Sequence, residues 1–505
     1  MSELPQGWSL ASLGMIAEIA TGSTPKRSES KYWDENGFPW LTSSVTGEPF
    51  CNNAEQFVSQ VAIEECRLKV FKKSTLLLAM YGEGKTRGQV TEIMFDATCN
   101  QACAAITVDQ AYVKNSYVKY RLVENYELTR KAAVGGNQPN LNLTKVRDIP
   151  VPLAPLAEQK RIVEKLDEVL VQVDTIKARL DGIPSLLKRF RQSVLASAVS
   201  GKLTEEWRGN CVSKIVSELI VSINVDREKL YLTEIDAGNK DTKRLLGKVK
   251  KHKPTLPSDE LPSSWIWTSF MESMDKVVDC HNKTAPYIEE GVPLIRTPDI
   301  RNGKISLEGA MYISQETYDY WSRRCPPVSG DIIFTREAPM GEAGIVPDNV
   351  TLCMGQRMML LRPNSNYIDP KYVLLNIMSL NFQERMGAQA IGTGVKHLRV
   401  ADVESLSYPL APLEEQKEIV RLVDQYFAFA DTIEAQVNKA QARVDNLTQS
   451  ILAKAFRGEL VAQDPNDEPA DKLLERIAEA RKEAEALAKA AKKAETAKKR
   501  AVKSA

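Results

Sequence analysis

Two stretches of this chain are near copies of each other: Leu153-Ala-Pro-Leu-Ala-Glu-Gln-Lys-Arg-Ile-Val-Glu-Lys-Leu-Asp167 and Leu410-Ala-Pro-Leu-Glu-Glu-Gln-Lys-Glu-Ile-Val-Arg-Leu-Val-Asp424. Ten of the fifteen positions are identical, and the copies are 257 residues apart. Other segments repeat at the same separation, namely Gln192–Ala198 with Gln449–Ala455 and Glu3–Trp8 with Glu260–Trp265. The chain therefore contains one unit of about 200 residues twice.

The segments between the matching parts, 10–135 and 267–392, barely resemble each other. They keep only short echoes in the same order: Gly37-Phe-Pro-Trp-Leu41 with Gly291-Val-Pro-Leu-Ile295, Asn100-Gln101 with Gly355-Gln356, and Tyr117-Val118 with Tyr372-Val373. Short β-rich runs at 74–79 and 331–335 lie between turn residues, and a helical stretch near the end of each insert covers 117–131 or 372–386. We expect two mixed α/β (α+β) domains of one fold that carry different binding surfaces.

Each matching segment begins a long amphipathic helix. Apolar residues recur at three- and four-residue steps from Ile162 to Leu195 and again from Ile419 to Ile451. Pro155 and Pro412 stand at the helix starts, where a missing N–H does no harm, and Gly201 and Gly458 stand at the ends. Gly182 and Pro184 interrupt only the first helix, which predicts a kink or a short break there.

Such helices, of about 45 residues and roughly 65 to 70 Å, must bury their apolar stripes. The repeat favours pairing of the two helices with each other, antiparallel, as a coiled coil that holds the two insert domains about a pseudo-two-fold axis. The alternative is that each helix packs on its own insert domain.

These patterns divide the chain into six parts. They are a first insert domain at 1–152, a conserved spacer helix at 153–203, a partly helical and basic linker at 204–259, a second insert domain at 260–409, a second spacer helix at 410–460, and a charged Ala/Lys/Glu-rich helical tail at 461–505. In the tail, a thin apolar edge that includes Leu473, Ile477 and Leu487 is typical of a partner-docking or partly frayed helix.

Composition excludes several classes of protein. The 505 residues are 43% hydrophobic and 26% charged, which is ordinary for soluble globular domains. The net charge of +1 hides basic runs at 240–253 and in the tail, which suit nucleic acid but also plain solvated surface. Eight cysteines without a Cys-x-x-Cys pair and three histidines give no metal-binding pattern. We see neither a signal peptide nor a membrane-spanning run, and expect a cytoplasmic protein.

The doubled motif order resembles the specificity subunits of type I restriction–modification systems. A Pro-Leu-x-Glu-Gln-x-x-Ile-Val helix start follows each of two divergent domains, and Leu-Pro-x-x-Trp opens both repeats at 4–8 and 261–265. Thr21-Gly-Ser-Thr-Pro25, Gly37-x-Pro-Trp40, Gly136-Asn-Gln-Pro-Asn140 and Gly330-Asp-Ile-Ile-Phe334 are also similar to that family's motifs. The second repeat departs with Gly392-Thr-Gly-Val-Lys-His-Leu398 in place of the Gln-Pro-Asn form.

The resemblance implies a division of labour. Each variable domain would be a target recognition domain for one half of a bipartite sequence in double-stranded DNA. The paired helices would set the gap and dock two methyltransferase (modification) subunits, and two restriction/translocase subunits would join the complex. This chain would be non-catalytic and without a cofactor of its own, because S-adenosylmethionine, ATP and magnesium would be bound by the partners.

Candidate contact residues follow from base-recognition chemistry and from the helix starts. Arg or Lys recognise guanine, Asn or Gln adenine, and Ser or Thr either base, although many such residues contact only phosphate. Candidates for DNA are Thr42, Ser43, Ser44, Lys85, Arg87, Asn137, Gln138 and Asn140 in the first domain, and Arg296, Lys304, Arg323, Arg324, Arg336 and Lys396 in the second. Candidates for spacer packing and subunit docking are Glu158, Gln159, Ile162, Val163, Leu166, Glu415, Gln416, Ile419, Val420 and Val423.

Two rival interpretations remain open on the sequence. Ala79-Met-Tyr-Gly-Glu-Gly-Lys-Thr86 fits a relaxed P-loop, but a strand-like segment follows it where a nucleotide-binding loop needs a helix. A coiled-coil scaffold without DNA specificity is the other alternative. No methyl-transfer motif, metal-nuclease cluster or metal site can be assembled from the sequence.

Overall fold

The computed structural model describes residues 4–82, 85–132, 140–210, 216–392, 394 and 396–503. The chain forms two compact units, and each unit contains segments of both repeats. Unit 1 comprises 1–181 and 439–505, and unit 2 comprises 182–438. Each unit thus combines one insert domain with parts of both long helices.

In unit 1 the insert domain is built on two sheets and a separate pair of strands. The larger sheet has the order β2 (Ala17–Thr21), β9 (Cys103–Val108), β6 (Leu76–Ala79), β7 (Val90–Ile93) and β4 (Phe50–Cys51). The smaller sheet has the order β5 (Gln56–Val58), β3 (Trp33–Leu41) and β8 (Thr98–Cys99), with β3 and β8 parallel. β1 (Ser9–Ser12) pairs with β10 (Pro150–Leu153) where the domain meets the helix start. All four residues of β6 are buried, as the apolar run predicts for a central strand.

Short helices cover these sheets. They are α1 (Leu13–Ile16), α2 (Gln60–Glu65), α3 (Asn115–Glu124), α4 (Tyr126–Lys131) and α5 (Leu143–Arg147), with 3₁₀ turns η1 (Ser30–Tyr32) and η2 (Ser43–Gly47). α3 and α4 confirm the helical stretch expected near the end of the first insert. Strand β7 follows the described part of the loop at 80–89, where a P-loop would need a helix start to hold a phosphate, so the P-loop interpretation is not supported.

Unit 2 repeats this topology, except that its larger sheet has four described strands and none at the place of β4. Its sheets have the orders β12 (Met274–Asp279), β20 (Met358–Pro363), β17 (Ile332–Thr335), β18 (Ala343–Ile345) and β16 (Met311–Ile313), β13 (Val292–Ile295), β19 (Cys353–Met354). β11 (Ile266–Ser269) pairs with β21 (Ser407–Leu410), and a hairpin of β14 (Ile300–Arg301) and β15 (Lys304–Ile305) has been added. The helices are α10 (Phe270–Ser273), α11 (Gln315–Ser322), α12 (Pro370–Met378), α13 (Leu380–Gln389) and α14 (Val400–Glu404), with the turn η4 (Thr297–Asp299). The expectation of one mixed fold used twice is confirmed.

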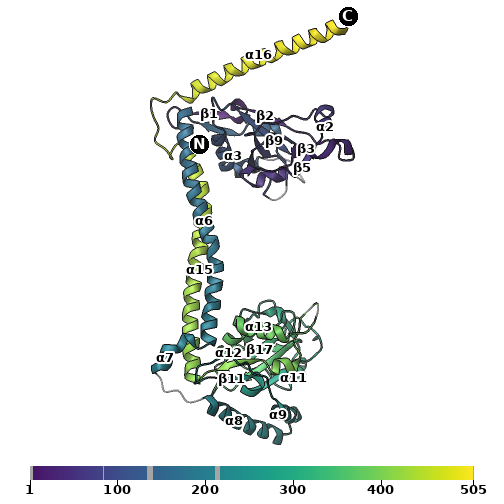
Figure 1. The fold of residues 1–505 in the computed structure, drawn as a ribbon, viewed down its shortest axis with the longest axis vertical. Coiled ribbons are helices and arrows are strands. Elements are labelled where there is room, and N and C mark those ends of the chain that lie inside the picture. Colours follow the sequence, from purple (N-terminus) through teal and green to yellow (C-terminus); the bar gives the residue numbers. More distant parts are fainter. Residues whose placement is uncertain are drawn as a thin grey trace. The chain divides into compact units, whose positions relative to one another are not determined.

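The long helices are α6 (Leu156–Val199) and α15 (Leu413–Phe456), which run side by side within each unit (Figure 1). In unit 1, Lys177 pairs with Asp445 at 2.8 Å, and Asp181 accepts a hydrogen bond from Gln441 at 2.9 Å. Residue numbers therefore increase along α6 while those of its contacts on α15 decrease. In unit 2, Arg191 pairs with Asp431 and Glu434 at 2.6 and 2.8 Å. The pairing is therefore antiparallel, as the repeat predicted.

Both helices end at glycines with positive φ, 75° at Gly201 and 74° at Gly458. α6 continues through Pro184, so there is no break at this point. Pro184 cannot donate a backbone hydrogen bond, but the packing of α6 against α15 on both sides of it holds the helix together.

Each unit is also closed by a glycine–proline contact between segments that are distant in sequence. A β-carbon placed on Gly201 would lie 2.5 Å from Pro262 Cγ, and one placed on Gly458 would lie 2.4 Å from Pro5 Cγ. The end of the first long helix therefore closes on the start of the second domain, and the end of the second helix on the start of the first.

The segment 204–259 is more than a linker, because its helices pack on the second domain. They are α7 (Glu205–Asn210), α8 (Val216–Asp236) and α9 (Lys240–Lys251). Arg227 of α8 donates to the backbone oxygens of Met271, Glu272 and Met274, and Lys248 of α9 pairs with Glu404 at 2.6 Å. The basic run in α9 is thus partly neutralised by the domain that it covers.

The tail forms α16 (Ala470–Lys503), whose first turns pack on the first domain. Leu473 and Ile477 belong to the main core of unit 1, whereas Leu487 is 72% exposed. In the parts of the chain that the structure describes, no helix is both long and apolar enough to cross a membrane.

Candidate nucleic-acid interface

In unit 1, five connecting segments meet at one edge of the domain. They are 22–29, 42–47, 80–89, 100–102 and 140–142, in their described parts, and we name them loop face 1. Hydrogen bonds join them: Asn100 N to Leu41 O at 2.9 Å, Met80 N to Ala102 O at 2.7 Å, Leu141 N to Met80 O at 3.1 Å, and Thr24 Oγ1 to Gln101 Oε1 at 2.7 Å. Backbone bonds therefore fix how these loops lie relative to one another.

Unit 2 has the equivalent loop face 2, built from 280–287, 296–299, 336–342, 355–357 and the described part of 391–398. The same backbone bonds recur: Gly355 N to Ile295 O at 2.8 Å, Arg336 N to Arg357 O at 2.8 Å, and Leu398 N to Arg336 O at 3.1 Å. Thr297 Oγ1 also donates to Ala338 O at 2.8 Å. One backbone arrangement thus presents two sets of side chains.

Those side chains differ in chemistry at matching positions. The first face has Thr42, Ala102 and Asn140 where the second has Arg296, Arg357 and His397, and the buried Met80 stands where the second face has the half-buried Arg336. Hydroxyl, amide and apolar groups on one face are thus replaced by cationic and imidazole groups on the other. Because base edges are distinguished by the donors and acceptors placed against them, the two faces are equipped for different targets.

The structure places most first-domain candidates on loop face 1. Thr42 caps η2, and its hydroxyl lies 2.6 Å from Ser44 Oγ, so the three residues 42–44 form one hydroxyl-bearing turn. Lys85 is exposed, Arg87 and Asn140 are half-buried, and Tyr126 and Arg130 of α4 donate to the backbone oxygens of Lys85 and Arg87. Asn137 and Gln138 lie outside the described residues.

The second-domain candidates have varied surroundings. Arg336 and Lys396 lie on loop face 2, with Arg336 half-buried and donating to Leu398 O at 3.0 Å. Arg296 is there too, but its guanidinium is held by Asp299 at 3.0 and 3.1 Å, and this bond raises the pKa of Arg296.

The other three candidates lie beside the face. Arg323 is exposed over the Tyr320 ring at 4.2 Å, and Lys304 is exposed on the added hairpin. Arg324 ties the end of α11 to Asp279 at 2.5 Å, so it fixes the start of the first loop of the face. This structural pairing makes Arg324 a weaker candidate for base contact.

Sequence reasoning missed several residues on these faces. In unit 1, Arg27 lies 4.3 Å from the centroid of Trp33 and 4.9 Å from that of Trp40. In unit 2, a cavity of about 120 Å³ is lined by residues that include Lys283, Gln356 and Arg357. The Asn100-Gln101 and Gly355-Gln356 echoes were the available signal, because they mark one connection in both copies.

Each helix start is attached to its domain by hydrogen bonds of which most occur in both repeats. Trp8 Nε1 donates to Glu158 Oε2 and Trp265 Nε1 to Glu415 Oε2, both at 2.9 Å. Gln159 and Gln416 each accept a backbone N–H from the domain, at 3.0 and 2.9 Å, and each donates to the backbone at 2.8 Å. The repeated Glu-Gln pair therefore attaches each domain to its spacer helix.

This geometry shows how the ten helix-start residues pack within the chain, as expected of spacer residues. Nine of the ten are buried and Val163 is half-buried, and subunit docking by any of them stays a prediction; the set is Glu158, Gln159, Ile162, Val163, Leu166, Glu415, Gln416, Ile419, Val420 and Val423. The sequence could not separate docking from internal packing, because both use an apolar stripe with polar ends.

The two clamping carboxylates differ in one respect. Glu415 Oε1 accepts from Thr204 at 2.7 Å and from Arg208 Nη1 at 2.6 Å. Glu158 Oε1 is buried, and among the described residues no hydrogen-bond partner reaches it. Burial raises the pKa of the Glu158 carboxyl, against the opposing effect of the Trp8 bond.

A family model described as the type I restriction modification DNA specificity domain matches residues 5–185 and 279–441. The EcoKI specificity subunit of Escherichia coli K12 is 30% identical over 94% of this chain and 96% of its own length. The StySPI subunit of Salmonella potsdam is also 30% identical, again over 94% and 96%. The EcoBI subunit of E. coli is 36% identical, over 67% of this chain and 66% of its own length.

Solved structures share the fold. The crystal structure of the HsdS subunit from Thermoanaerobacter tengcongensis aligns over 90% of this chain and 98% of that one, with TM-score 0.55 and 18% identity. A chain from a structural study of type I restriction–modification assembly and conformational transition aligns over 91% and 100%, with TM-score 0.58 and 18% identity. The two family-matched segments, the doubled fold and the near-full-length relatives agree, and the chain belongs to the family of type I restriction–modification DNA specificity subunits.

Proposed function

We propose that this chain gives a type I restriction–modification complex its DNA specificity, with loop face 1 and loop face 2 each recognising one half of a bipartite sequence. One observation carries the proposal: the two faces have the same backbone hydrogen bonds but different side chains. A shared scaffold with divergent contact residues is what recognition of two unlike half-sites requires.

The packing of the two long helices suggests their role in the complex. We propose that the paired helices set the gap between half-sites and that exposed helix positions contribute to docking two methyltransferase subunits. Two restriction/translocase subunits would complete the assembly in the cytoplasm. The chain would act without catalysis or a cofactor of its own, while the partners bind S-adenosylmethionine, ATP and magnesium.

The central test is to express the chain with its methyltransferase subunit and map methylated adenines across genomic DNA. We expect an asymmetric, interrupted motif. Two matched variants assign the halves: Arg27→Ala on the first face and Arg357→Ala on the second should each relax only one half. Because a lost base contact costs about 1–3 kcal/mol, sites with a substitution in that half should gain methylation relative to the full site.

Several outcomes would contradict this proposal. A continuous palindrome would exclude two independent faces. Relaxation of both halves by either variant would mean that the variants disturb assembly instead of base recognition. Unchanged motifs, with only a uniform loss of affinity, would reassign both arginines to phosphate contacts.

The gap is tested by adding one heptad to each spacer helix at equivalent positions. Seven residues lengthen a helix by about 10 Å, which corresponds to about three base pairs at 3.4 Å per step. We expect a longer gap with both half-sequences kept. An unchanged gap in an active complex would show that the helices do not set it.

A further inference from the structure

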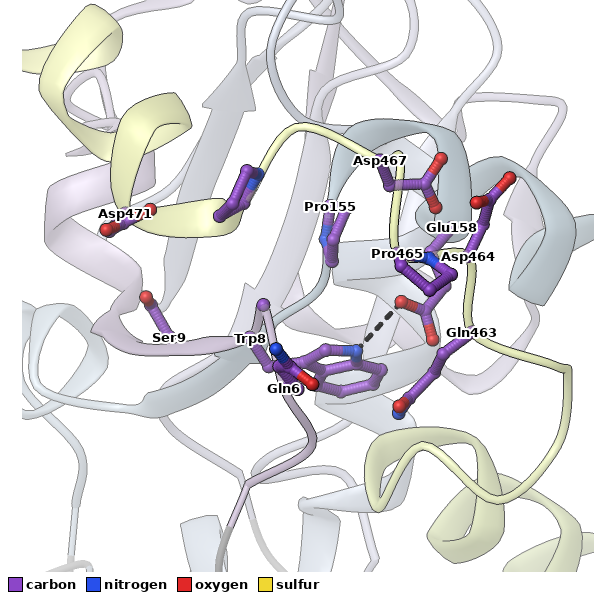
Figure 2. A pocket seen from close by; sticks show the side chains of 12 residues that line it. Gln6, Trp8, Ser9, Pro155, Glu158, Gln463, Asp464, Pro465, Asp467 and Asp471 are labelled. Atoms are coloured by element: carbon purple, nitrogen blue, oxygen red, sulfur yellow. Dashed lines mark hydrogen bonds between the residues drawn. The ribbon is translucent and has the colours of Figure 1, made fainter.

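A cavity of about 320 Å³ lies in unit 1 between the start of α6, the start of the first domain and the segment after α15. Figure 2 shows Trp8 and Glu158 at its centre, with Asp464 and Asp467 beside them. Its wall also includes Asp471, and Asp467 is paired with Arg161 at 2.7 Å. Four carboxylates against the one guanidinium of Arg161 leave the lining of this cavity with a net negative charge.

The Glu158 carboxylate is built into this wall. Its side chain comes from a residue that is 1% exposed, Oε2 is held by Trp8, and Oε1 has no hydrogen-bond partner among the described residues. A buried carboxylate oxygen without a partner is costly, so native proteins usually satisfy it. The unsatisfied atom indicates that a donor is missing from this site.

The second copy of the site identifies the missing donor. In unit 2, Glu415 holds the Trp265 indole in the same way, and its other oxygen is bound by the Arg208 guanidinium at 2.6 Å. Arg208 also lies 5.8 Å from the centroid of the Trp265 ring. A guanidinium beside a carboxylate and an indole therefore satisfies this clamp where the chain itself supplies one.

Among the described residues of unit 1, no guanidinium forms a hydrogen bond with Glu158 Oε1. The residue 257 positions after Arg208 is Pro465. The Gln463 amide takes part of the space: its Nε2 lies 3.0 Å from a β-carbon placed on Gly458, as Arg208 Nη1 lies 3.0 Å from one placed on Gly201. Gln463 is exposed, so it can turn away when another group enters.

We propose that this cavity binds the guanidinium group of an arginine supplied by a partner protein, which pairs with Glu158 as Arg208 pairs with Glu415. The acidic wall favours a cation, and the planar fork of a guanidinium suits a carboxylate next to an aromatic ring. The partner source rests on the proposed function, in which the chain works within a multi-subunit complex. Binding of the guanidinium itself is tested on the isolated chain, so the two ideas can fail separately.

The first test is calorimetric titration of the full chain with N-acetyl-arginine amide, with the isosteric, neutral N-acetyl-citrulline amide as control. We expect the arginine compound to bind at least about tenfold more tightly, because only it carries the charge. Glu158→Gln keeps an oxygen for the Trp8 bond and should weaken arginine binding about tenfold or more. The matched variant Glu415→Gln should leave it unchanged.

A second variant covers the case in which Glu158→Gln disturbs folding. Gln463→Arg starts from an exposed side chain and brings a guanidinium to the cavity within the chain. We expect it to raise the unfolding temperature and to abolish binding of the added arginine compound. Citrulline binding equal to arginine binding, arginine binding unaffected by Glu158→Gln in a folded protein, or no saturation at about 10 mM ligand would each overturn the site.

The protein source is tested by repeating the titration with the chain assembled with its methyltransferase subunit. A partner arginine in the cavity should block the added compound. If the assembled complex binds the compound as tightly as the isolated chain does, the guanidinium site stands but the partner does not fill it. Failure of the DNA-specificity proposal would instead be seen in the methylation motif.

Discussion

Removing the Arg208 guanidinium should destabilise unit 2 strongly, because it leaves a buried charge behind. Glu415 is fully buried, and the Arg208 side chain is only 18% exposed. Truncating one member of a buried ion pair costs about 3–5 kcal/mol. Trp265 and Thr204 still donate hydrogen bonds to Glu415, so we expect the loss of stability caused by Arg208→Ala to lie near the lower limit of this range. For a unit of this size, about 3 kcal/mol lowers the melting temperature by roughly 6–12 °C.

Differential scanning calorimetry on the full chain measures this change. The unit 1 transition serves as an internal reference, because Arg208 and Glu415 both belong to unit 2. Arg208→Ala combined with Glu415→Gln should recover most of the loss, since the unpaired charge is then absent. The exposed pair of Arg457 and Glu459 is the matched control, and Arg457→Ala should cost at most about 0.5 kcal/mol.

The reasoning fails if Arg208→Ala shifts the unit 2 transition by less than about 2 °C. It also fails if the double variant is no more stable than the single one. Either result would mean that water or a moved side chain satisfies Glu415 without Arg208. The comparison with Glu158 would then lose its basis.

Three further outcomes are expected. Leu473→Ala should destabilise unit 1 by about 3 kcal/mol in denaturant unfolding, whereas Leu487→Ala should have no effect, because Leu473 is buried and Leu487 is 72% exposed. Gly22→Ala should weaken recognition of the first half-site in binding assays, since a β-carbon there would lie 1.7 Å from a backbone oxygen of β8, while Gly47→Ala has open space and should be neutral. Burial raises the pKa of Glu158, so just above pH ~4.3 the folded state binds more protons than the unfolded state. The contribution of this group to the free energy of unfolding should therefore fall as pH rises through that window, and Glu158→Gln should remove the fall. Parallel curves of stability against pH for the two proteins would contradict this prediction.

The sequence predicts the elements whose signal is periodic. The apolar stripes predict α6 and α15, their antiparallel pairing and their glycine ends, because burial of a stripe and positive φ are local requirements. The sequence predicts less about how the segment at 204–259 packs. Tyr231, which is buried and bonded to Asp275 O, cannot be recognised in advance as a core residue of a domain that begins further along the chain.

For the candidate sites too, the sequence predicts local features but not contacts between distant residues. Thr42 and Arg336 lie on the loop faces as expected, since loops with donors and acceptors are where recognition residues concentrate. Arg27 was missed because its stacking on two tryptophans joins positions without a common motif. The bond between Glu158 and Trp8 could not be predicted, because a polar residue at a helix start has the same sequence pattern whether it faces solvent or a tryptophan 150 residues away.

The glycine–proline contacts are consistent with the origin of such a chain by fusion of two copies of one repeat. Each domain is closed by the far end of the other repeat's helix, at Gly201 with Pro262 and at Gly458 with Pro5. Two separate copies of a single repeat could make the same pair of contacts between chains. Fusion of two such copies, and later divergence of the insert domains, would turn a symmetric dimer for a palindromic target into a single chain for an asymmetric one, without altering the closure of either unit.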